Sequence, residues 1–487
     1  MTPEEMTTLI NEDRYSKAKR HARKGQDYYE GKHEILDYQI YFIDADGNLQ
    51  RDYQRSNVRV SHPFFTELVD QEVQYLLSGG IKVESEDGDL AELVQAYFDE
   101  EFTAEMSELI EGAVIKGWDY LVAYKDAAGK TRFTHTDSLG VIEIKDGTND
   151  TVTDAFLYYY PVKTEKKRPA LRVEYWDQHT TTYYLYSDGS MVKDPNIYPN
   201  PRPHVLYDIG DSYEVGELGY LPLFRLDNNK KRISGLAPIK DLIDDYDLMD
   251  CGLSNNIQDA AESIYVIKGY KPVGGRTLDD LIFNLKQKKQ IAVGEKGDVD
   301  IKTVDIPYEA RKIKAEQDEK NIYRFGMGFN SSQVGDGNIT NIVIKSRYFL
   351  LDLKCNKMLI RVQRLLKQLL KVVLDEINDL HGTAYKASDI RFVLDREVMT
   401  NAADNAEIEE KEAMTKQTLI NMILSVADYL PDETVIRKIC DVLDIDWDDI
   451  ADKLPDPDIS VEQVTASMSE EDDEEVREGS REESSAE

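Results

Sequence analysis

Residues 348–380 read YFLLDLKCNKMLIRVQRLLKQLLKVVLDEINDL, and this stretch decides the fold. Its apolar side chains recur at steps of three and four, which predicts a long amphipathic helix with an a/d seam. The dipeptide His381-Gly382 follows it and predicts a C-cap. At 1.5 Å per residue, a helix of this span is about 50 Å long. The predicted seam consists of Tyr348, Leu351, Cys355, Met358, Val362, Leu365, Leu369 and Val372.

The sequence before this helix predicts a loop and a stalk. Residues 326–340 hold four glycines together with Ser, Asn and Asp, which is typical of a flexible loop. Further upstream, the segment 308–325 predicts a heavily charged helix, and a short Gly-punctuated α/β insert at 265–307 precedes it. Apolar residues spaced by three and four predict another helix before the insert. The two helices would pack antiparallel as a stalk, with the insert as a small knob at its end. The apolar positions of that first helix are Ile239, Leu242, Ile243, Tyr246, Met249, Leu253 and Ile257.

The N-terminal part of the chain mixes helices with strands. Residues 1–34 predict a helix, and residues 38–43 and 49–53 predict a hairpin around Asp46-Gly47-Asn48. Between residues 120 and 186 the period changes to two, which predicts an antiparallel sheet. Further helices are expected at 63–77, 90–101 and 105–116, strands at 120–124, 131–135, 141–144, 155–160, 171–176, 181–186 and 390–394, and a Pro/Gly-rich loop at 195–219.

Two charged segments differ in what they predict. The first helix carries a basic cluster, which is typical of a solvated helix face. The region 402–454 is helical in pattern and acidic. Because the predicted strands and helices occupy separate stretches of the sequence, the chain as a whole is expected to be of the α+β class. The basic cluster consists of Lys17, Lys19, Arg20, His21, Arg23 and Lys24.

Composition excludes several classes of protein. The chain has 487 residues, with 59 basic and 94 acidic side chains, so its net charge is −35. That charge argues against a protein that coats nucleic acid, which needs Lys and Arg to neutralise phosphates. No apolar run approaches the roughly 20 residues of a membrane-spanning helix, and three distant cysteines exclude a disulfide framework. The last residues, from Glu470, are so acidic and so poor in apolar side chains that we expect disorder there.

The sequence shows no recognisable catalytic constellation. Gly129-Lys130-Thr131 lacks the upstream glycine of a phosphate-binding loop, because Tyr124 occupies that position. Residues 444–448 have the acidic spacing of a calcium loop, but Pro455 stands where the bidentate Glu belongs. An acidic cluster on the first stalk helix could mimic a metal site, although solvation of its wet faces explains it better. The cluster consists of Asp241, Asp244, Asp245, Asp247 and Asp250.

Four stretches carry a family resemblance. Residues 221–229 (LPLFRLDNN) and 234–247 (SGLAPIKDLIDDYD) resemble the start of the stem in portal proteins of long-tailed bacteriophages from Gram-positive hosts. Residues 338–358 (NITNIVIKSRYFLLDLKCNKM) resemble the tunnel loop and long helix of that family, and residues 28–35 (YYEGKHEI) resemble the exit from its N-terminal helix. The resemblance reaches to about residue 395, and the remainder is similar only in being helical and acidic.

The resemblance implies a portal-like α+β protomer. Such protomers form a ring, usually of twelve subunits, at one capsid vertex, and DNA passes through the ring during packaging and ejection. Carried onto this chain, the regions would be the wing (1–234), the first stem helix (235–264), the clip (265–307), the second stem helix (308–329), the tunnel loop (330–343), the long helix with the C-terminal wing (344–395), the crown (396–465) and a disordered acidic tail (466–487).

The resemblance also implies partners and a place. The expected partners are other copies of the chain, double-stranded DNA in transit, terminase, a head-completion or connector protein, and the scaffolding and major capsid proteins. The expected location is the virion, after assembly in the host bacterial cytoplasm and without contact with a membrane. We expect no enzymatic activity and no cofactor, because a conduit needs no catalysis.

The implied site residues lie in the tunnel loop and the clip. The loop side chains are polar and not basic, so they would contact DNA through single, easily broken hydrogen bonds. The clip lysines either face acidic partners or are simply solvated. The residues themselves leave two other classes open, a metal-dependent enzyme using the cluster near Asp244 and a monomeric acidic adaptor in a host cytosol. The loop residues are Gln333, Asp336, Asn338, Thr340 and Asn341, and the clip lysines are Lys286, Lys288 and Lys289.

Overall fold

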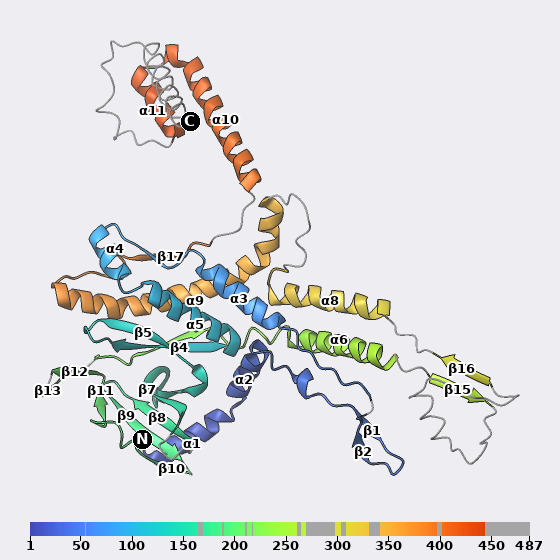
Figure 1. Cartoon of the computed structure of the whole chain (residues 1–487). Helices are drawn as coiled ribbons and strands as arrows, with labels where there is room; N and C mark the ends of the chain where they lie inside the picture. The colour runs from blue at the N-terminus through green and yellow to red at the C-terminus, as the bar shows by residue number, and fades with distance from the viewer. Residues whose placement is uncertain are drawn as a thin grey trace, which may run out of the picture. The chain divides into compact units, whose positions relative to one another are not determined.

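The computed structural model in Figure 1 describes most of the chain. It divides into two compact units, one comprising residues 1–338 and 342–399 and the other comprising residues 339–341 and 400–487. The described residues are 1–53, 55–163, 169–187, 189–209, 212–216, 218–260, 264–268, 298–302, 308–330, 341–396 and 402–443.

Helices and strands alternate irregularly along the chain, which confirms the α+β class. The helices are α1 (Pro3–Arg14), α2 (Lys17–Tyr29), α3 (Phe64–Leu77), α4 (Gly88–Gln95), α5 (Glu100–Lys116), α6 (Lys240–Ala260), α8 (Tyr308–Gly326), α9 (Asn341–His381), α10 (Ala402–Ser425) and α11 (Asp432–Leu443). The strands are β1 (Tyr41–Ile43), β2 (Leu49–Arg51), β3 (Lys82–Glu84), β4 (Trp118–Lys125), β5 (Thr131–Thr136), β6 (Val141–Asp146), β7 (Asn149–Lys163), β8 (Pro169–Trp176), β9 (Thr180–Ser187), β10 (Ser190–Lys193), β11 (Arg202–Pro203), β12 (Val205–Ile209), β13 (Ser212–Gly216), β14 (Leu223–Asp227), β15 (Ile264–Lys268), β16 (Asp298–Lys302) and β17 (Arg391–Val393).

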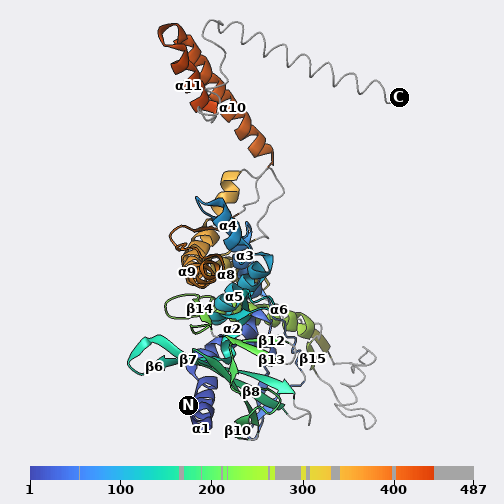
Figure 2. The same cartoon turned by 90° about the vertical axis from the view of Figure 1, so that its left-hand side faces the viewer.

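Antiparallel pairing organises the strands of the first unit. Strands β10-β9-β8-β7-β6 form an antiparallel meander, with β11 also paired to β9. The strand β4 lies between β14 and β5 in a separate sheet, so the prediction of one continuous sheet from residue 120 to residue 186 was wrong. The long β6–β7 hairpin projects away from the other strands of its sheet, as Figure 2 shows. Helix α1 places Met6 and Ile10 against the meander, and both side chains are buried.

Helix α9 belongs to the main hydrophobic core of the first unit. Its apolar face packs in one cluster with side chains of α3, α4, α5 and the β4–β5 sheet. The predicted helix and its C-cap are confirmed, and Gly382 has φ +66°. The deeply buried side chains are Leu351, Cys355, Met358, Val362, Leu365, Leu366, Leu369, Leu370, Val373, Leu374 and Ile377.

The a/d seam predicted for α9 is buried from Leu351 to Leu369 and departs from the core at Val372. Val372 is half-buried, and Val373 on the neighbouring position is buried instead. An α-helix has 3.6 residues per turn, so a strict seven-residue repeat drifts by about 20° per heptad around it. Further along α9 the core therefore receives a wider face, with buried pairs such as Leu369 and Leu370, rather than a coiled-coil seam.

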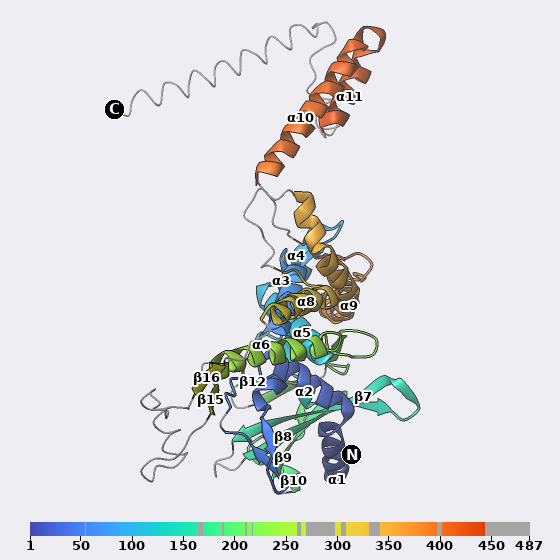
Figure 3. The same cartoon turned by 90° about the vertical axis from the view of Figure 1, so that its right-hand side faces the viewer.

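Helices α6 and α8 pack against each other, as Figures 1 and 3 show. The antiparallel strands β15 and β16 lie between them in the chain, in register from Ile264 opposite Lys302. This confirms the two predicted helices and their packing. Most of the predicted insert, including Lys286, Lys288 and Lys289, lies outside the described residues.

Local side-chain caps shift several predicted boundaries. The helix expected at 1–34 is two helices, because the Ser16 hydroxyl caps a new start by accepting a hydrogen bond from Lys19 N. Asp99 likewise accepts from Phe102 N, so α5 begins at Glu100 rather than at residue 105. The loop expected at 195–219 contains β11, β12 and β13. The hairpin at 38–53, the helix α3 and the strand near 390 are confirmed.

The second unit contains α10 and α11, which confirms helices in the acidic region that follows residue 400. The two helices pack against each other within this unit. The expected acidic tail, 466–487, lies outside the described residues. Among the described helices none is long and apolar enough to cross a membrane.

Candidate functional site

The segment that leads from α8 toward α9 is held firmly at its first end. Gln71 of α3 donates a hydrogen bond to Phe329 O at 2.7 Å and accepts one from Phe329 N at 2.9 Å. The ring of Phe329 stacks on Tyr348 of α9, with centroids 4.9 Å apart and ring planes 11° from parallel. Phe329, just before the stretch 331–340, is thus tied to both α3 and α9.

The tunnel loop expected at 330–343 begins directly after Phe329. Gln333, Asp336, Asn338 and Thr340 lie outside the described residues, and Asn341 is the first residue of α9. The role given to these five residues stays a prediction. The supporting residues Gln71 and Tyr348 belong to the periodic faces of α3 and α9, so the sequence offered no signal that distinguished them from core residues.

Ion pairs fix α9 to the first unit along its length. Lys354 pairs with the buried Glu72 of α3 at 2.9 Å, and Arg396 pairs with Asp352 at 2.5 Å. Near the other end, Glu376 accepts from Lys125 at 2.8 Å and from Tyr97 at 3.0 Å. These contacts, together with its buried face, make α9 a rigid support for the segment that precedes it.

The carboxylate of Glu376 illustrates how these pairs work. Burial acts to raise its pKa, but hydrogen bonds from Lys125 and Thr131 and the charge of Lys125 outweigh burial and lower the pKa. The carboxylate is thus ionised where the helix meets strands β4 and β5. A buried ion pair is costly to break, because removal of one partner leaves the other charge buried without compensation.

The pair α6–α8 contrasts with this well-packed region. Lys314 of α8 bridges Asp245 of α6 and Asp318 on its own helix. Arg311 donates to Met249 O at 3.5 Å. The half of α8 nearer the β15–β16 strands has no buried side chain among its described residues. The pair leaves large apolar side chains exposed, namely Leu248, Ile257, Tyr308 and Ile313.

A buried carboxylate joins α6 to the N-terminal segment. Asp247 has no exposed side-chain surface and lies 2.6 Å from His33 Nδ1 and 2.7 Å from His62 Nδ1. His33 also stacks on Tyr28, with ring centroids 4.4 Å apart. Burial acts to raise the pKa of Asp247, but the hydrogen bonds to the two histidines lower it.

This arrangement corrects the interpretation of the acidic cluster on α6. Solvation does not explain Asp247, which is buried. Asp244 accepts from Tyr28 and Lys240, and Asp245 pairs with Lys314. No group of three or more His, Cys, Asp or Glu side chains in the described part of the chain is arranged to hold a metal ion. The carboxylates of α6 are instead structural partners for cations and histidines.

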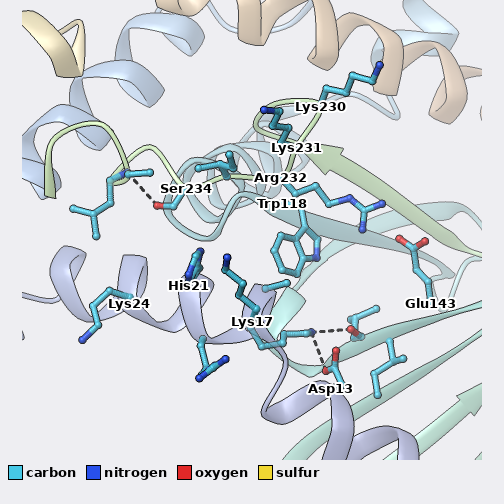
Figure 4. Close-up of a pocket in the computed structure, with 18 of the residues that line it drawn as sticks. Asp13, Lys17, His21, Lys24, Trp118, Glu143, Lys230, Lys231, Arg232 and Ser234 are labelled. Atoms are coloured by element: carbon cyan, nitrogen blue, oxygen red, sulfur yellow. Dashed lines mark hydrogen bonds and ion pairs between the residues drawn. The ribbon is translucent and has the colours of Figure 1, made fainter.

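A basic cavity of about 1070 Å³ lies between α2, β4, β6 and the loop before α6. Figure 4 shows Lys17 and His21 of α2 on one side and Lys230 and Lys231 of the loop on the other, with Trp118 between them. The other charged side chains of the lining are Asp13, Lys19, Arg20, Lys24, Glu143, Lys145, Arg232, Lys240 and Asp241.

The cavity corrects the interpretation of the basic cluster on the first helix. Lys19 is only 2% exposed, donates to Val141 O at 2.9 Å and pairs with Asp13 at 3.3 Å. Burial lowers the pKa of Lys19, against the opposing effect of Asp13. Lys19 therefore lies buried beneath the cavity and not on a solvated helix face. Its neighbours on α2 line the cavity together with Lys230, Lys231 and Arg232.

One acid of the cavity is strongly ionised. Burial acts to raise the pKa of Glu143, but Lys145 and Arg225 outweigh it and lower the pKa to about 2. Because Glu143 already pairs with Lys145 and Arg225, it does not neutralise the other basic side chains of the lining. No ion pair among the described residues involves Lys17, Arg20, Lys230 or Lys231.

Comparison with known proteins gives a consistent result. The family model described as phage portal protein, SPP1 Gp6-like, matches residues 10–440 of this chain. The portal protein of Bacillus phage SPP1 is 28% identical over 336 residues, covering 68% of this chain and 65% of the relative, so the chain spans less than two thirds of that relative's length. The portal protein of Clostridium phage phiCD119 is 24% identical over 411 residues, covering 80% of this chain and 85% of the relative.

Two solved structures also resemble the chain. A chain from the virion of a native gene transfer agent particle is 14% identical, with a TM-score of 0.40 over 79% of this chain and 91% of that chain. A chain from the neck of an empty gene transfer agent particle is 13% identical, with a TM-score of 0.38 over 78% of this chain and 90% of that chain.

Proposed function

The chain belongs to the SPP1 Gp6-like family of phage portal proteins, and on that premise we propose that it assembles into a ring that forms the DNA channel at one vertex of a capsid. The family is one of structural assembly proteins. The match over residues 10–440 carries the proposal, because it includes the core, the α6–α8 pair and α9 together.

The exposed faces of α6 and α8 support assembly. Ile313 is 62% exposed and Ile257 is 54% exposed, although both lie on helices that are otherwise well formed. Helices in proteins gain most of their stability from packing of an apolar face, so the large apolar side chains that α6 and α8 leave exposed favour a further partner. In a ring, the neighbouring copies would cover these faces through a heterologous contact that closes on itself.

The proposed ring suggests an assignment of regions to the protomer. We assign α6 and α8 to the stem, β15 and β16 to the clip, residues 330–343 to the tunnel loop, and α10 with α11 to the crown. The first unit outside the stem and clip would be the wing. The virion would be its final place, after assembly in the bacterial cytoplasm. Proposed partners are DNA, terminase, a connector protein, and the scaffolding and major capsid proteins.

The net charge supports passage of DNA rather than storage of it. A basic wall would bind phosphate with release of counterions, whereas an acidic wall repels it. The repulsion acts within a screening length of about 8 Å at physiological salt, which suits a bore slightly wider than the duplex. A channel that must let its cargo slide therefore benefits from the charge of −35 per chain.

Ring assembly can be tested directly. We expect native mass spectrometry at micromolar protein and high salt to show a closed oligomer of one main size, and negative-stain microscopy to show rings. High salt matters because −35 charges per subunit repel one another at low salt. A monomer alone under these conditions would contradict the proposal and favour a monomeric acidic adaptor.

The role of the tunnel loop needs a separate experiment. We expect deletion of residues 335–339 to leave rings and proheads intact but to impair packaging or retention of DNA. The segments that support the loop, at Phe329 and Tyr348, remain in this variant, so the fold of the protomer should be unchanged. Packaging of genome-length DNA by the variant would make the loop a plain connector, and loss of rings would make it a subunit contact.

The enzyme hypothesis has less support. It relied on Asp244 and Asp247, and the structure gives both carboxylates partners within the protein. We expect Asp244→Ala and Asp247→Ala to change stability or assembly without removing any metal-dependent turnover. A divalent metal that stabilises the purified protein, with loss of that effect in both variants, would revive the hypothesis.

A further inference from the structure

The β1–β2 hairpin is an arm with an uncovered apolar face. Every residue of both strands is exposed, and Ile43 and Leu49 are 72% and 67% exposed. The pairs Ile43 with Leu49 and Tyr41 with Arg51 place three apolar side chains on one face. An isolated two-stranded hairpin is marginally stable in water at best. Among the residues that the structure describes, none covers this face of the arm.

The tip of the arm is acidic and well formed. Asp44 closes the turn by accepting hydrogen bonds from Asp46 N at 3.0 Å and Asn48 N at 2.8 Å. Gly47 adopts φ +85°, which the turn requires and a glycine permits. The side chain of Asp46 is exposed and makes no ion pair among the described residues. The tip thus presents negative charge ahead of the apolar face.

The basic cavity has the opposite character. Its lining carries nine Lys or Arg side chains against three carboxylates, in a chain whose net charge is −35. Between these charges the lining is apolar, with Ala18, Val141, Ile142 and Ile233 among its residues. Such a surface fits a ligand with an acidic end and an apolar side.

The two surfaces cannot meet within one copy in this structure. None of the residues that line the cavity comes from the hairpin. In Figure 1 the β1–β2 arm projects beyond α2, away from the β6–β10 sheet. Two complementary patches at different places on one chain are the requirement for a head-to-tail contact between identical subunits.

We propose that the β1–β2 arm of one copy docks into the basic cavity of the next copy. The acidic tip lies among Lys17, Lys230 and Lys231, and the apolar face of the arm covers Ile233 and the apolar floor. This inference rests on the proposed ring, and it names the contact that orders the subunits. Because every copy contributes one arm and one cavity, the contact repeats around the ring without leaving an unpaired end.

Duplex DNA fits the cavity less well. A duplex presents a stiff line of phosphates and binds along extended basic surfaces. The cavity is instead a hollow, and its apolar floor has no hydrogen-bond donor or positive charge for a phosphate. A short protein hairpin can enter such a hollow and fill it with both kinds of contact.

Charge reversal tests the contact. We expect Asp46→Lys to weaken assembly about tenfold or more, and Lys230→Glu with Lys231→Glu to do the same, because rim charges set the orientation of partners. The chain that carries all three substitutions should assemble again, since both sides of each contact are reversed together. The control Glu86→Lys makes the same change of charge at another exposed position and should assemble normally.

A cysteine pair tests which chains meet. The natural cysteines are buried, so Ile43→Cys with Ile233→Cys offers two exposed thiols. Mild oxidation should give a ladder of covalent multimers from this chain, and Ile43→Cys alone should give none beyond a dimer. A single fast-running monomer band would show that the arm folds onto its own subunit, which would overturn the proposal.

The outcomes separate this inference from the proposed ring. If the unaltered chain forms no rings, the proposed function fails first. If it forms rings while the charge variants assemble normally and the cysteine pair gives no ladder, only the docking of the arm is wrong. Loss of duplex binding in Lys230→Glu with Lys231→Glu, with assembly intact, would likewise overturn it in favour of a DNA contact.

Discussion

Helix α9 and the α6–α8 pair are all long and amphipathic, yet the apolar face of α9 is buried while apolar side chains of α6 and α8 are exposed. Leu369 and Val373 of α9 are fully buried, whereas Ile313 of α8 is 62% exposed. Ion pairs to Glu72, Asp352 and Glu376 hold α9 against the first unit. Helices α6 and α8 pack mainly on each other, and part of each also reaches the core, through residues such as Ile243 and Ile322.

In the proposed ring, this difference separates the part of the chain that packs fully within one copy from the part that neighbouring copies would cover. Burial of apolar surface stabilises α9 in a single chain, at about 25 cal/mol per Å². The α6–α8 pair and the β1–β2 arm leave apolar faces exposed, and in the proposed ring other copies would cover them. Substitutions in the first region should act on folding, and substitutions in the second should act on assembly.

The largest effect is expected in the core. Leu369→Ala should lower the free energy of unfolding by about 2–5 kcal/mol, because it opens a cavity in a fully buried site. Ile313→Ala should change unfolding of the monomer by less than about 0.5 kcal/mol but should weaken assembly. Urea unfolding below the assembly concentration measures the first quantity, and native mass spectrometry measures the second.

This pair of variants can break the comparison. If Ile313→Ala destabilised the monomer as much as Leu369→Ala, the stem would be packed within one chain. If Leu369→Ala weakened assembly with no effect on unfolding, α9 would be an interface helix. Leu353→Ala, at an exposed position of α9, is the matched control and should leave both quantities nearly unchanged.

The sequence predicted the elements better than their partners. Periodicity alone located α6, α8, α9 and the strands of the meander, because burial of one face imposes a period on each element. It could not tell that α6 and α8 leave large apolar side chains exposed while α9 buries its apolar face in the core, since all of these helices also have a polar face. The shift of the buried position from Val372 to Val373 was also not predicted, because the seam was extended with a strict seven-residue repeat, which a straight helix does not follow.

The candidate site was harder to predict than the fold. Lys17 and Lys230 lie more than two hundred positions apart, and only the tertiary fold brings them to one cavity. His33 and His62 had no metal spacing, and their contact with Asp247 depends on α6 crossing the N-terminal segment. Side-chain contacts between distant segments leave no periodic trace in either one.

A smaller effect is expected where the loop meets α9. Phe329→Ala removes the stack on Tyr348 and should lower the stability of this junction by about 1–2 kcal/mol. Hydrogen exchange should quicken at the end of α8 and the start of α9 and not in the β6–β10 sheet. The conservative Phe329→Tyr should preserve slow exchange, and equal quickening in the distant sheet would show that the junction is no separate unit.

A pH effect should follow from His62. Its hydrogen bond to Asp247 raises the pKa of His62 above the usual value, against the effect of burial. A raised pKa contributes stability that is fully present below about pH 6.5 and is lost as the pH rises through the folded value. We expect the unfolding free energy to fall as the pH rises from about 6 to about 8 because of this group.

The variant His62→Gln isolates that contribution. It keeps a donor for Asp247 and removes the titration, so the fall between about pH 6 and pH 8 should shrink. His135, whose pKa is also raised by Asp119, remains in both proteins and supplies the same background. An unchanged pH profile in His62→Gln would place the titration elsewhere and remove the stem junction from the pH dependence.

The smallest effect is expected at the acidic end of the chain. Residues 470–487 hold ten acidic and two basic side chains, a net charge of −8, and Val476 and Ala486 are their only apolar residues besides glycine. Such a segment has almost nothing to bury, so truncation after Ser469 should leave ring assembly at high salt unchanged. At low salt the truncated chain should assemble slightly better, because eight negative charges per subunit no longer repel. Native mass spectrometry across a salt series measures both, and rings that fail to form at any salt would make this segment a subunit contact.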